Sequence, residues 1–161
     1  MLSLKDATQQ IQSLMDTVMR YQRRRTLFTR LGRVMKTDTG MNFRRQQSPD
    51  DEPWEPLKFR QGRILSDTGR LRNSIHFEAN DDQVVIGTNV KYARVHQFGA
   101  VIKPVKKKVL AFPDGRGGTA FARQVTIPAR PFIGIEERQI NLIHDAMTQW
   151  LRDITRGRRN A

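Results

Sequence analysis

Apolar residues recur at steps of three and four near the N-terminus, which predicts an amphipathic helix over roughly residues 4 to 21. Ser3 followed by Asp6 resembles a capping box at its start. The apolar stripe consists of Leu4, Ala7, Ile11, Leu14, Met15 and Val18. Thr26 can cap a second helix that extends as far as Phe43. The apolar face of this second helix consists of Leu27, Leu31, Val34 and Met35.

Prolines interrupt the helical pattern over residues 48–57, where three of them fall within the eight positions 49–56. Each proline fixes one backbone angle and removes a hydrogen-bond donor, so neither a helix nor a central strand is expected. We predict a rigid connector. Trp54 stands in this polar stretch, and we expect it to fold back as an anchor against the helices. An exposed tryptophan at a subunit contact would show the same pattern.

The central region combines short helices with strands. Asp67 or Thr68 can cap a short helix that places Leu71 and Ile75 on one side. Apolar and polar residues then alternate over 75–79, and an apolar run returns over 84–86 after a turn at 80–82. This pattern predicts a hairpin with one buried face.

A further helical turn or two is predicted over residues 91–98, followed by Gly99 where a left-handed cap is needed. Residues 108–113 and 120–127 predict a second, longer hairpin around the glycine-rich tip 114–119. We expect this tip to be mobile and the hairpin to form an arm toward a neighbouring molecule.

A last helix is predicted to begin near Glu136. Its buried stripe consists of Ile140, Ile143, Met147, Leu151 and Ile154. The basic tail from residue 156 onward is expected to fray. The elements together predict an α+β fold in which an antiparallel sheet of two hairpins packs with N-terminal and C-terminal helices.

A chain of 161 residues is about one domain's worth, so we predict a single domain over 1–161. Its four regions are a basic helical region (1–47), a Pro-rich connector (48–64), a β-rich core with short helices (65–134), and a C-terminal helix with a basic tail (135–161). Hydrophobic residues are 37% of the chain, which allows a core with little surplus.

Positive charge dominates the chain, with 29 Lys and Arg residues against 16 Asp and Glu residues and a formal net charge of +13. Self-repulsion of this size must be offset by counterions, assembly or an acidic partner. The run Arg23, Arg24 and Arg25 and the run Lys106, Lys107 and Lys108 can contact DNA phosphates or acidic protein surfaces. Aromatic residues do not interleave with these runs, which disfavours a single-strand stacking platform.

No residue pattern in the sequence predicts catalysis, a cofactor or a metal site. There is no cysteine, and the three histidines, His76, His96 and His144, lack the spacing of a helical metal pair. The acidic pairs and runs fall in a connector and a turn, where solvated turn residues explain them better than a catalytic dyad. The 114–119 tip lacks the Gly-Lys-Ser/Thr ending of a phosphate loop. We therefore predict that the protein is not an enzyme.

A membrane partner is not expected. The N-terminus becomes polar too early for a secretory signal, and no apolar run approaches the ~20 residues that cross a bilayer.

Five fragments occur in order along the middle and end of the chain: Pro49-Asp50 with Trp54-x-Pro56-Leu57; Leu65-x-Asp67-Thr68-Gly69-Arg70-Leu71-x-x-Ser74-Ile75; Val85-Ile86-Gly87-Thr88; Tyr92-Ala93-x-x-His96-Gln97-Phe98-Gly99; and Ile127-Pro128-Ala129-Arg130-Pro131-Phe132-Ile133-Gly134. Over about residues 26 to 154, the chain resembles the phage virion morphogenesis proteins, the tail completion family of Mu-type contractile-tailed phages. One departure is Asp51, where a glycine commonly follows the Pro-Asp pair.

The resemblance implies a structural virion protein of the tail or neck, assembled in the host cytoplasm, which completes the tail and enables head-tail joining. It implies a homo-hexameric ring around the DNA channel, with the neck or connector protein and the tail tube or terminator protein as partners. Either a terminator or a neck position fits. The main alternative is a DNA-binding accessory protein that uses its basic helices.

The resemblance also suggests which side chains contact subunits or partners: Trp54, Arg70, Tyr92, His96, Phe98, Arg130 and Phe132. Arg130 lies between an alanine and a proline, and this stiff segment would hold its guanidinium ready for a carboxylate on a neighbour. The aromatic residues Tyr92, Phe98 and Phe132 fit a core position or a subunit contact equally well.

Overall fold

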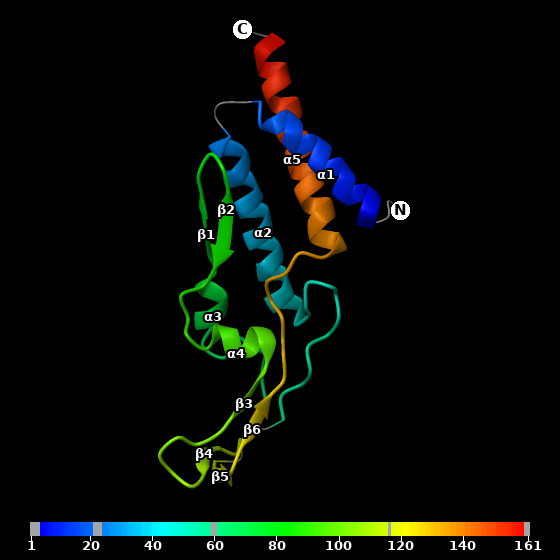
Figure 1. The fold of residues 1–161 in the computed structure, drawn as a ribbon. Coiled ribbons are helices and arrows are strands. Elements are labelled where there is room, and N and C mark those ends of the chain that lie inside the picture. The colour runs from blue at the N-terminus through cyan, green and yellow to red at the C-terminus, as the bar shows by residue number, and fades with distance from the viewer. Residues whose placement is uncertain (1–3, 21–23, 59–60, 116, 160–161) are drawn as a thin grey trace. The chain divides into compact units, whose positions relative to one another are not determined.

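The computed structural model describes residues 4–20, 24–58, 61–115 and 117–159, and it is an α+β fold (Figure 1). The chain forms two compact units. Unit 1 consists of Met1–Met41, Ile75–Gly87 and Gly134–Ala161, and unit 2 consists of Asn42–Ser74 and Thr88–Ile133. Each unit thus draws on segments that are distant in sequence, so the four regions predicted from composition do not map onto the units one to one.

Unit 1 contains the long helices: α1 (Leu4–Val18), the greater part of α2 (Arg25–Arg45), and α5 (Glu137–Arg159). The three amphipathic helices predicted from periodicity are confirmed. Their apolar faces meet in one core, whose buried members are Val18, Leu27, Phe28, Leu31, Ala146, Met147 and Trp150. Burial of apolar surface is the main stabilising contribution in such a core.

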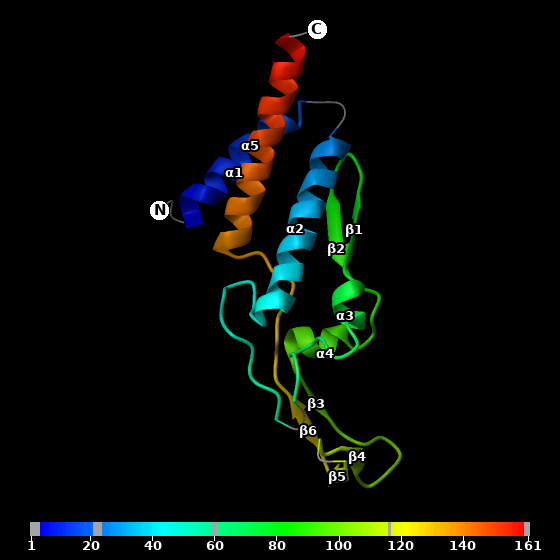
Figure 2. The ribbon, with the colours of Figure 1, turned by 180° about the vertical axis from the view of Figure 1, so that it is seen from behind.

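The hairpin of unit 1 pairs β1 (His76–Ala79) with β2 (Val84–Gly87) in antiparallel register, with Phe77 opposite Ile86. It lies along α2 in both ribbon views (Figures 1 and 2). The predicted hairpin is therefore confirmed, and its burial alternates as an antiparallel pair with one solvated face requires.

The start of α2 differs from the prediction that Thr26 caps it. Helix α2 already begins at Arg25, and the backbone N–H of Arg25 donates to Oδ1 of Asp81 at 2.9 Å. An aspartate at a helix N-terminus satisfies an unpaired donor and interacts favourably with the helix dipole. Thr26 has another role, because its Oγ1 accepts a hydrogen bond from Nε1 of Trp150 at 2.9 Å.

A buried polar cluster connects α2 and α5. Asp38 is buried and accepts hydrogen bonds from Arg138 and from Nε2 of Gln139, the latter at 2.8 Å. Gln139 is fully buried, and its Oε1 accepts from the backbone N–H of Glu136 at 2.9 Å, at the start of α5. Because buried charge is costly unless it is paired, this cluster fixes how the two helices align.

Unit 2 contains short elements: α3 (Arg70–Asn73), α4 (Ala93–Phe98), β3 (Ala100–Ile102), β4 (Leu110–Pro113), β5 (Thr119–Ala122) and β6 (Val125–Ile127). β4 and β5 form the predicted glycine-tipped hairpin. The predicted second strand over 120–127 is wrong in its length. It is divided at Arg123 and Gln124, two consecutive exposed residues that interrupt the two-residue alternation of a strand.

The sheet arrangement also differs from the prediction. The described residues form three separate two-stranded antiparallel sheets, β1–β2, β3–β6 and β4–β5, where the sequence predicted one sheet of two hairpins. Strand β6 pairs with the unpredicted β3, with Ala100 opposite Ile127. At Gly99, between α4 and β3, a Cβ would lie 2.9 Å from the backbone N of Ala129, so this close approach requires glycine.

The core of unit 2 confirms the prediction that Trp54 is an anchor. Trp54 packs edge-on against Phe43 of α2, with ring centroids 5.6 Å apart, and Phe132 lies 5.2 Å from Phe43. The indole Nε1 of Trp54 donates to the backbone O of Pro131 at 2.7 Å. The three aromatic side chains are buried, so they bring the connector and the 130–133 segment together.

No helix in the described part of the chain is long and apolar enough to span a membrane.

We predict opposite effects of alanine at two glycines of α2. A Cβ at Gly32 would overlap the ring of Phe77, whereas a Cβ at Gly40 would meet no atom within 4 Å. Gly32→Ala should lower the free energy of unfolding by about 1 to 3 kcal/mol through overpacking. Gly40→Ala should raise it by about 0.5 to 1 kcal/mol, because alanine has less backbone entropy to lose in a helix. Urea unfolding of the two variants beside the parent protein measures both; equal effects would contradict this packing of β1 on α2.

Asp153 predicts a pH dependence of stability. Arg30 donates to its Oδ2 at 2.7 Å, and this hydrogen bond lowers the pKa of Asp153. A carboxyl whose pKa is lower when folded stabilises the fold above its unfolded pKa of about 3.9, and this contribution is lost as the pH falls through the folded value. Asp153→Asn should therefore lower the melting temperature at pH 7 and have little effect at pH 2. A difference that is unchanged between the two pH values would contradict the ion pair.

Candidate functional site

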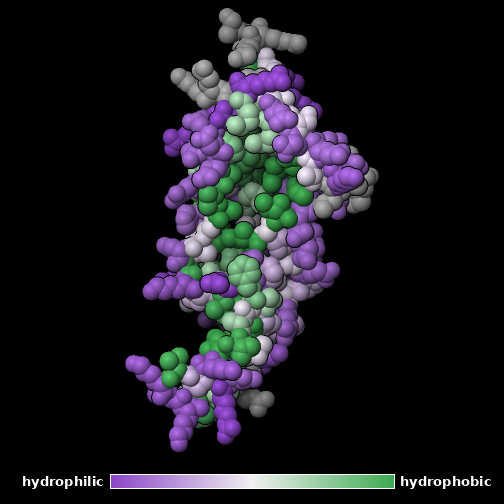
Figure 3. Space-filling model, in the orientation of Figure 1, coloured by the Kyte–Doolittle hydropathy of each residue, from purple (hydrophilic) through white to green (hydrophobic). Residues whose placement is uncertain are grey.

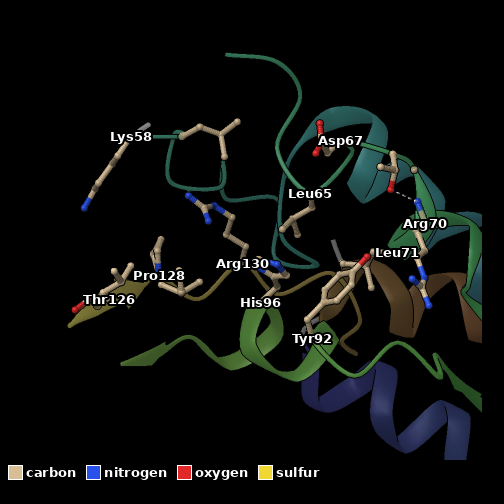
Figure 4. A pocket seen from close by; sticks show the side chains of 15 residues that line it. Lys58, Leu65, Asp67, Arg70, Leu71, Tyr92, His96, Thr126, Pro128 and Arg130 are labelled. Carbon is tan, nitrogen blue, oxygen red and sulfur yellow. Dashed lines mark hydrogen bonds between the residues drawn. The ribbon is translucent and has the colours of Figure 1, made fainter. Parts of the chain in front are cut away.

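A groove of about 850 Å³ lies within unit 2 (Figure 4). Three segments build it: the end of the connector with the loop up to α3, the first turns of α4, and the chain from β6 onward. The lining residues include Leu57, Lys58, Leu65, Asp67, Arg70, Leu71, Tyr92, His96, Ile127, Pro128 and Arg130. Several of these residues belong to the fragments that carry the family resemblance.

Arg130 holds the connector wall of the groove in place. Its side chain is 5% exposed, and its Nε and one terminal nitrogen donate to the backbone oxygens of Glu55 at 2.8 Å and Pro56 at 3.1 Å. A guanidinium offers several donors in a rigid plane and remains charged, so it suits two carbonyl groups in fixed positions. The sequence suggested that the Arg130 guanidinium would bind a carboxylate of a neighbouring subunit. The structure places two carbonyls of the same chain there.

Helix α4 supplies the second wall. Tyr92 and His96 are four residues apart, with ring centroids 5.8 Å apart in an edge-on arrangement, and both side chains border the groove (Figure 4). Tyr92 is 41% exposed, so its ring is available to a bound molecule. The spacing of four residues places two side chains on one face of a helix.

Hydrogen bonds from α4 position the third wall. The backbone N–H of Arg130 donates to the backbone O of His96 at 2.7 Å. The Oε1 of Gln97 accepts from the backbone N–H of Phe132 at 3.1 Å, and its Nε2 donates to the backbone O of Ile133 at 2.7 Å. The side-chain amide of Gln97 thus accepts from one backbone N–H and donates to one backbone carbonyl, as the backbone of a neighbouring strand would. These hydrogen bonds fix the segment after β6 to α4.

The loop before α3 completes the groove. Gly69 adopts a left-handed conformation with φ of 71° directly before α3, and the backbone N–H of Arg70 donates to Oγ1 of Thr68 at 3.3 Å. Leu71 of α3 lines the groove and is buried. The prediction that Asp67 or Thr68 caps this helix is therefore wrong, because the N-cap is Gly69, which makes no side-chain cap hydrogen bond.

The chemistry of the groove favours binding. Leucine, isoleucine and proline side chains offer apolar surface, and Lys58 and Arg70 at the margin add positive charge against the single acid Asp67. Such a surface suits an apolar segment that carries carboxylates. In the described residues, no group of three or more His, Cys, Asp or Glu side chains is arranged to hold a metal ion.

The structure brings four of the seven suggested contact residues together, because Arg70, Tyr92, His96 and Arg130 all line the groove. Trp54 and Phe132 lie in the core of unit 2, where this chain's own residues cover them. Phe98 lies outside the lining and is 72% exposed. The sequence left open whether Tyr92, Phe98 and Phe132 are core or contact residues. In the structure Phe132 is a core residue, whereas Tyr92 borders the groove and Phe98 is exposed.

The basic runs are placed differently from one another. Arg23 lies outside the described residues. Arg24 forms an ion pair with Asp82 at 3.0 Å, and its side chain is only 16% exposed, whereas Arg25 is exposed. Lys106, Lys107 and Lys108 are all exposed in the loop between β3 and β4. Only the second run therefore presents every one of its cations to an outside partner.

Sequence reasoning missed the groove itself, because its walls come from segments that are far apart in the chain. The signal that the sequence did offer was the set of family-like fragments, several of whose residues line the groove. The departure at Asp51 is also explained: this residue has φ of 65°, the left-handed conformation that favours glycine. The turn therefore keeps the backbone path that a glycine would adopt.

The connector carries four acidic side chains. A hydrogen bond from Ser48 lowers the pKa of Asp50 below its ordinary value. Asp50, Asp51, Glu52 and Glu55 are all exposed.

Comparison with known proteins identifies relatives in phages and prophages. The model of the phage virion morphogenesis family matches residues 2–152. The "Mu-like prophage FluMu G protein 2" of Haemophilus influenzae is 36% identical over 110 residues, which cover 68% of this chain and 65% of that protein. The "Putative capsid assembly protein G" of Escherichia phage Mu is 28% identical over 149 residues, which cover 85% of each chain. No solved structure matches the chain significantly.

We predict that the guanidinium of Arg130 stabilises unit 2. Arg130→Ala removes two hydrogen bonds from a charged donor, so it should lower the free energy of unfolding by about 2 kcal/mol. Arg130→Lys keeps the charge without the planar arrangement of donors, and it should recover only part of this loss. Arg70→Ala, on the exposed margin of the same groove, is the matched control and should change stability by less than about 0.5 kcal/mol. Denaturant unfolding measures all three; an unaffected Arg130→Ala variant would contradict the assigned role.

Proposed function

Because the chain belongs to the phage virion morphogenesis family and is thus a phage virion assembly protein, we propose that it completes the tail at its head-proximal end and enables head-tail joining. In this role copies of the chain form a closed ring around the DNA channel, with six copies as the expected number.

 The proposed partners are the neck protein and the tail tube or terminator protein. The proposed location is the tail or neck of the virion, after assembly in the host cytoplasm. A closed ring buries a surface on both sides of every subunit, which suits a chain with a small core and excess charge.

The observation that carries this proposal is the groove of unit 2. Residues of the family-like fragments build an open, largely apolar surface there, with Tyr92 partly exposed and cations at the margin. A surface of this kind binds another protein segment and does not by itself activate a substrate. The family is one of structural and morphogenesis proteins, and the proposal accordingly assigns the chain no enzymatic activity.

A second candidate function rests on the exposed lysines at 106–108. A DNA-binding accessory protein would use these side chains, together with Arg25, to neutralise phosphates. Binding of this kind releases counterions, so it weakens steeply as salt increases. In the tail-completion role proposed first, the same cations face the passing genome or an acidic protein partner.

The test of the proposed function is a phage that lacks this gene product. We expect particles without the protein to accumulate unjoined heads and tails, and complementation to restore joined virions that contain the protein. Native mass spectrometry of the purified chain should detect a ring. A chain that stays monomeric and is absent from virions would refute the proposal.

Duplex DNA of random sequence distinguishes the second candidate. Retained affinity at physiological salt would favour the accessory protein, whereas affinity that is lost between 50 and 200 mM salt, about the range in which non-specific contacts weaken, would favour the assembly role.

A further inference from the structure

The groove of unit 2 combines apolar walls with positive charge. Leu57, Leu65 and Ile127 line it, and Tyr92 at its side is partly exposed. Arg70 stands at the margin, where its side chain is exposed and forms no ion pair within the described residues (Figure 4). A groove of this kind suits an apolar side chain that is accompanied by a carboxylate.

The charge of the groove excludes a basic occupant. Lys58 at the margin already forms an ion pair with Glu55 at 3.0 Å. Arg70 and Arg130 then remain, and guanidinium groups keep their charge, whereas Asp67 is the single acid in the lining. A lysine or arginine close to the occupying side chain would be repelled, because like charges placed against each other oppose association.

Most of the large apolar side chains that the described residues expose fail this charge requirement. Figure 3 shows apolar surface among projecting hydrophilic side chains at the end of unit 2 that carries β3 to β6. The lysines at 103 and 106–108 are exposed there, and Met19 of unit 1 is followed by the exposed Arg20. The apolar side chains excluded in unit 2 are Phe98, Val101, Ile102, Val105, Val109 and Phe121.

Ile135 meets the charge requirement. It is 63% exposed, and Glu136 and Glu137 follow it directly and are exposed as well. Neither carboxylate forms an ion pair within the described part of the chain. The next basic residue, Arg138, is held by the buried Asp38. We call Ile135, Glu136 and Glu137 the acidic segment.

The backbone of the acidic segment also suits insertion into a groove. Residues 134–136 form no regular secondary structure before α5 begins, so Ile135 has no paired strand beside it. Val85 is another exposed apolar residue next to a carboxylate, because Glu78 lies opposite it in the β1–β2 register. Val85 belongs to the face of a paired strand, and a sheet face does not enter a concave surface as a single segment does.

The groove and the acidic segment are different parts of each copy. The groove belongs to unit 2, whereas the acidic segment belongs to unit 1 and contributes no residue to the lining of the groove. Between the two, Phe132 is buried and the backbone of Ile133 is bonded to Gln97. Two different, complementary surfaces on each copy are what a head-to-tail interface requires, and such an interface forms a ring when the rotation closes.

We propose that the acidic segment of one copy occupies the groove of the next copy, with Ile135 against the apolar walls and the carboxylates of Glu136 and Glu137 facing Arg70. The inference rests on the proposed ring and identifies the surfaces that close it. Burial of Ile135 supplies the apolar contact, and the pairing of carboxylate with guanidinium orients the two copies.

The first test reverses the charge on each side of this contact. One variant carries Glu136→Lys and Glu137→Lys, a second carries Arg70→Glu, and a third combines all three substitutions. A fourth variant, Ile135→Ser, removes the apolar side chain and leaves the charges unchanged. Thermal melting verifies that every variant folds.

Each variant has a matched control. Asp16→Lys with Glu78→Lys reverses two exposed acids of unit 1 and changes the net charge as the acidic-segment variant does. Arg72→Glu reverses an exposed arginine of the same short helix as Arg70, at a position outside the groove lining. Val85→Ser removes a comparably exposed apolar side chain of unit 1.

Native mass spectrometry of the purified chain measures ring formation, and complementation measures joined virions. We expect either charge reversal, and Ile135→Ser, to weaken association about tenfold or more, because each removes a side chain from the centre of the contact. The combined variant should recover association, and the three controls should assemble like the parent protein. A general effect of altered charge cannot produce recovery in the combined variant.

A mixing experiment shows whether the contact lies between copies. The reversed acidic segment of the first variant matches the reversed groove of the Arg70→Glu variant, and the unchanged segment and groove of the pair match as well. When one of the two variants is isotope-labelled, we expect the mixture to form rings that contain both in equal amounts, although each variant assembles poorly alone.

Three results would overturn the inference while leaving the proposed function intact. The first is rings that form normally in both single-sided reversals, and the second is a combined variant that stays as defective as they are. The third is a combined variant that recovers while the mixture does not, because the acidic segment would then occupy the groove of its own copy. A parent protein that neither forms a ring nor enters virions is a separate result, which refutes the proposed function itself.

Discussion

The hydrogen bonds between α4 and the 130–133 segment are the constraint on which unit 2 depends. Gln97 accepts from Phe132 and donates to Ile133, while the carbonyl of His96 accepts from Arg130. Once this segment is fixed, Phe132 reaches the core beside Phe43, and Arg130 reaches the connector carbonyls. Two walls of the groove, the 130–133 segment and the connector, are therefore positioned from one helix of six residues.

The composition of the chain agrees with a role in assembly. The formal net charge is +13, and the basic side chains behind it are of two kinds, those paired within the fold and those exposed to solvent. Arg24 and Arg30 are paired with aspartates of unit 1, so part of the positive charge stabilises the fold. The lysines at 106–108 are exposed, and the four acidic residues of the connector are exposed as well. Charges of opposite sign in separate regions of one unit favour ordered association over non-specific aggregation.

Local patterns were sufficient to predict the long helices and the first hairpin, because their apolar residues repeat at the period of the element. The same signals failed for β3, a strand of three residues whose partner β6 follows only after residue 124. They also assigned the start of α2 to Thr26, whereas Asp81 from a distant turn accepts the hydrogen bond there. The groove could not be derived from spacing, since three segments meet in it through contacts such as those of Gln97. The fragments of the family resemblance indicated its residues without their arrangement.

The pairing of α1 with α5 has a consequence for how the protein is made. These helices lie against each other in unit 1, although more than a hundred residues separate them in the chain. During translation α1 emerges first and must wait for its partner until α5, at residues 137–159, has left the ribosome. Long-range pairing of this kind slows folding and leaves apolar surface open in the nascent chain. Translation products that end before α5 therefore lack a finished unit 1.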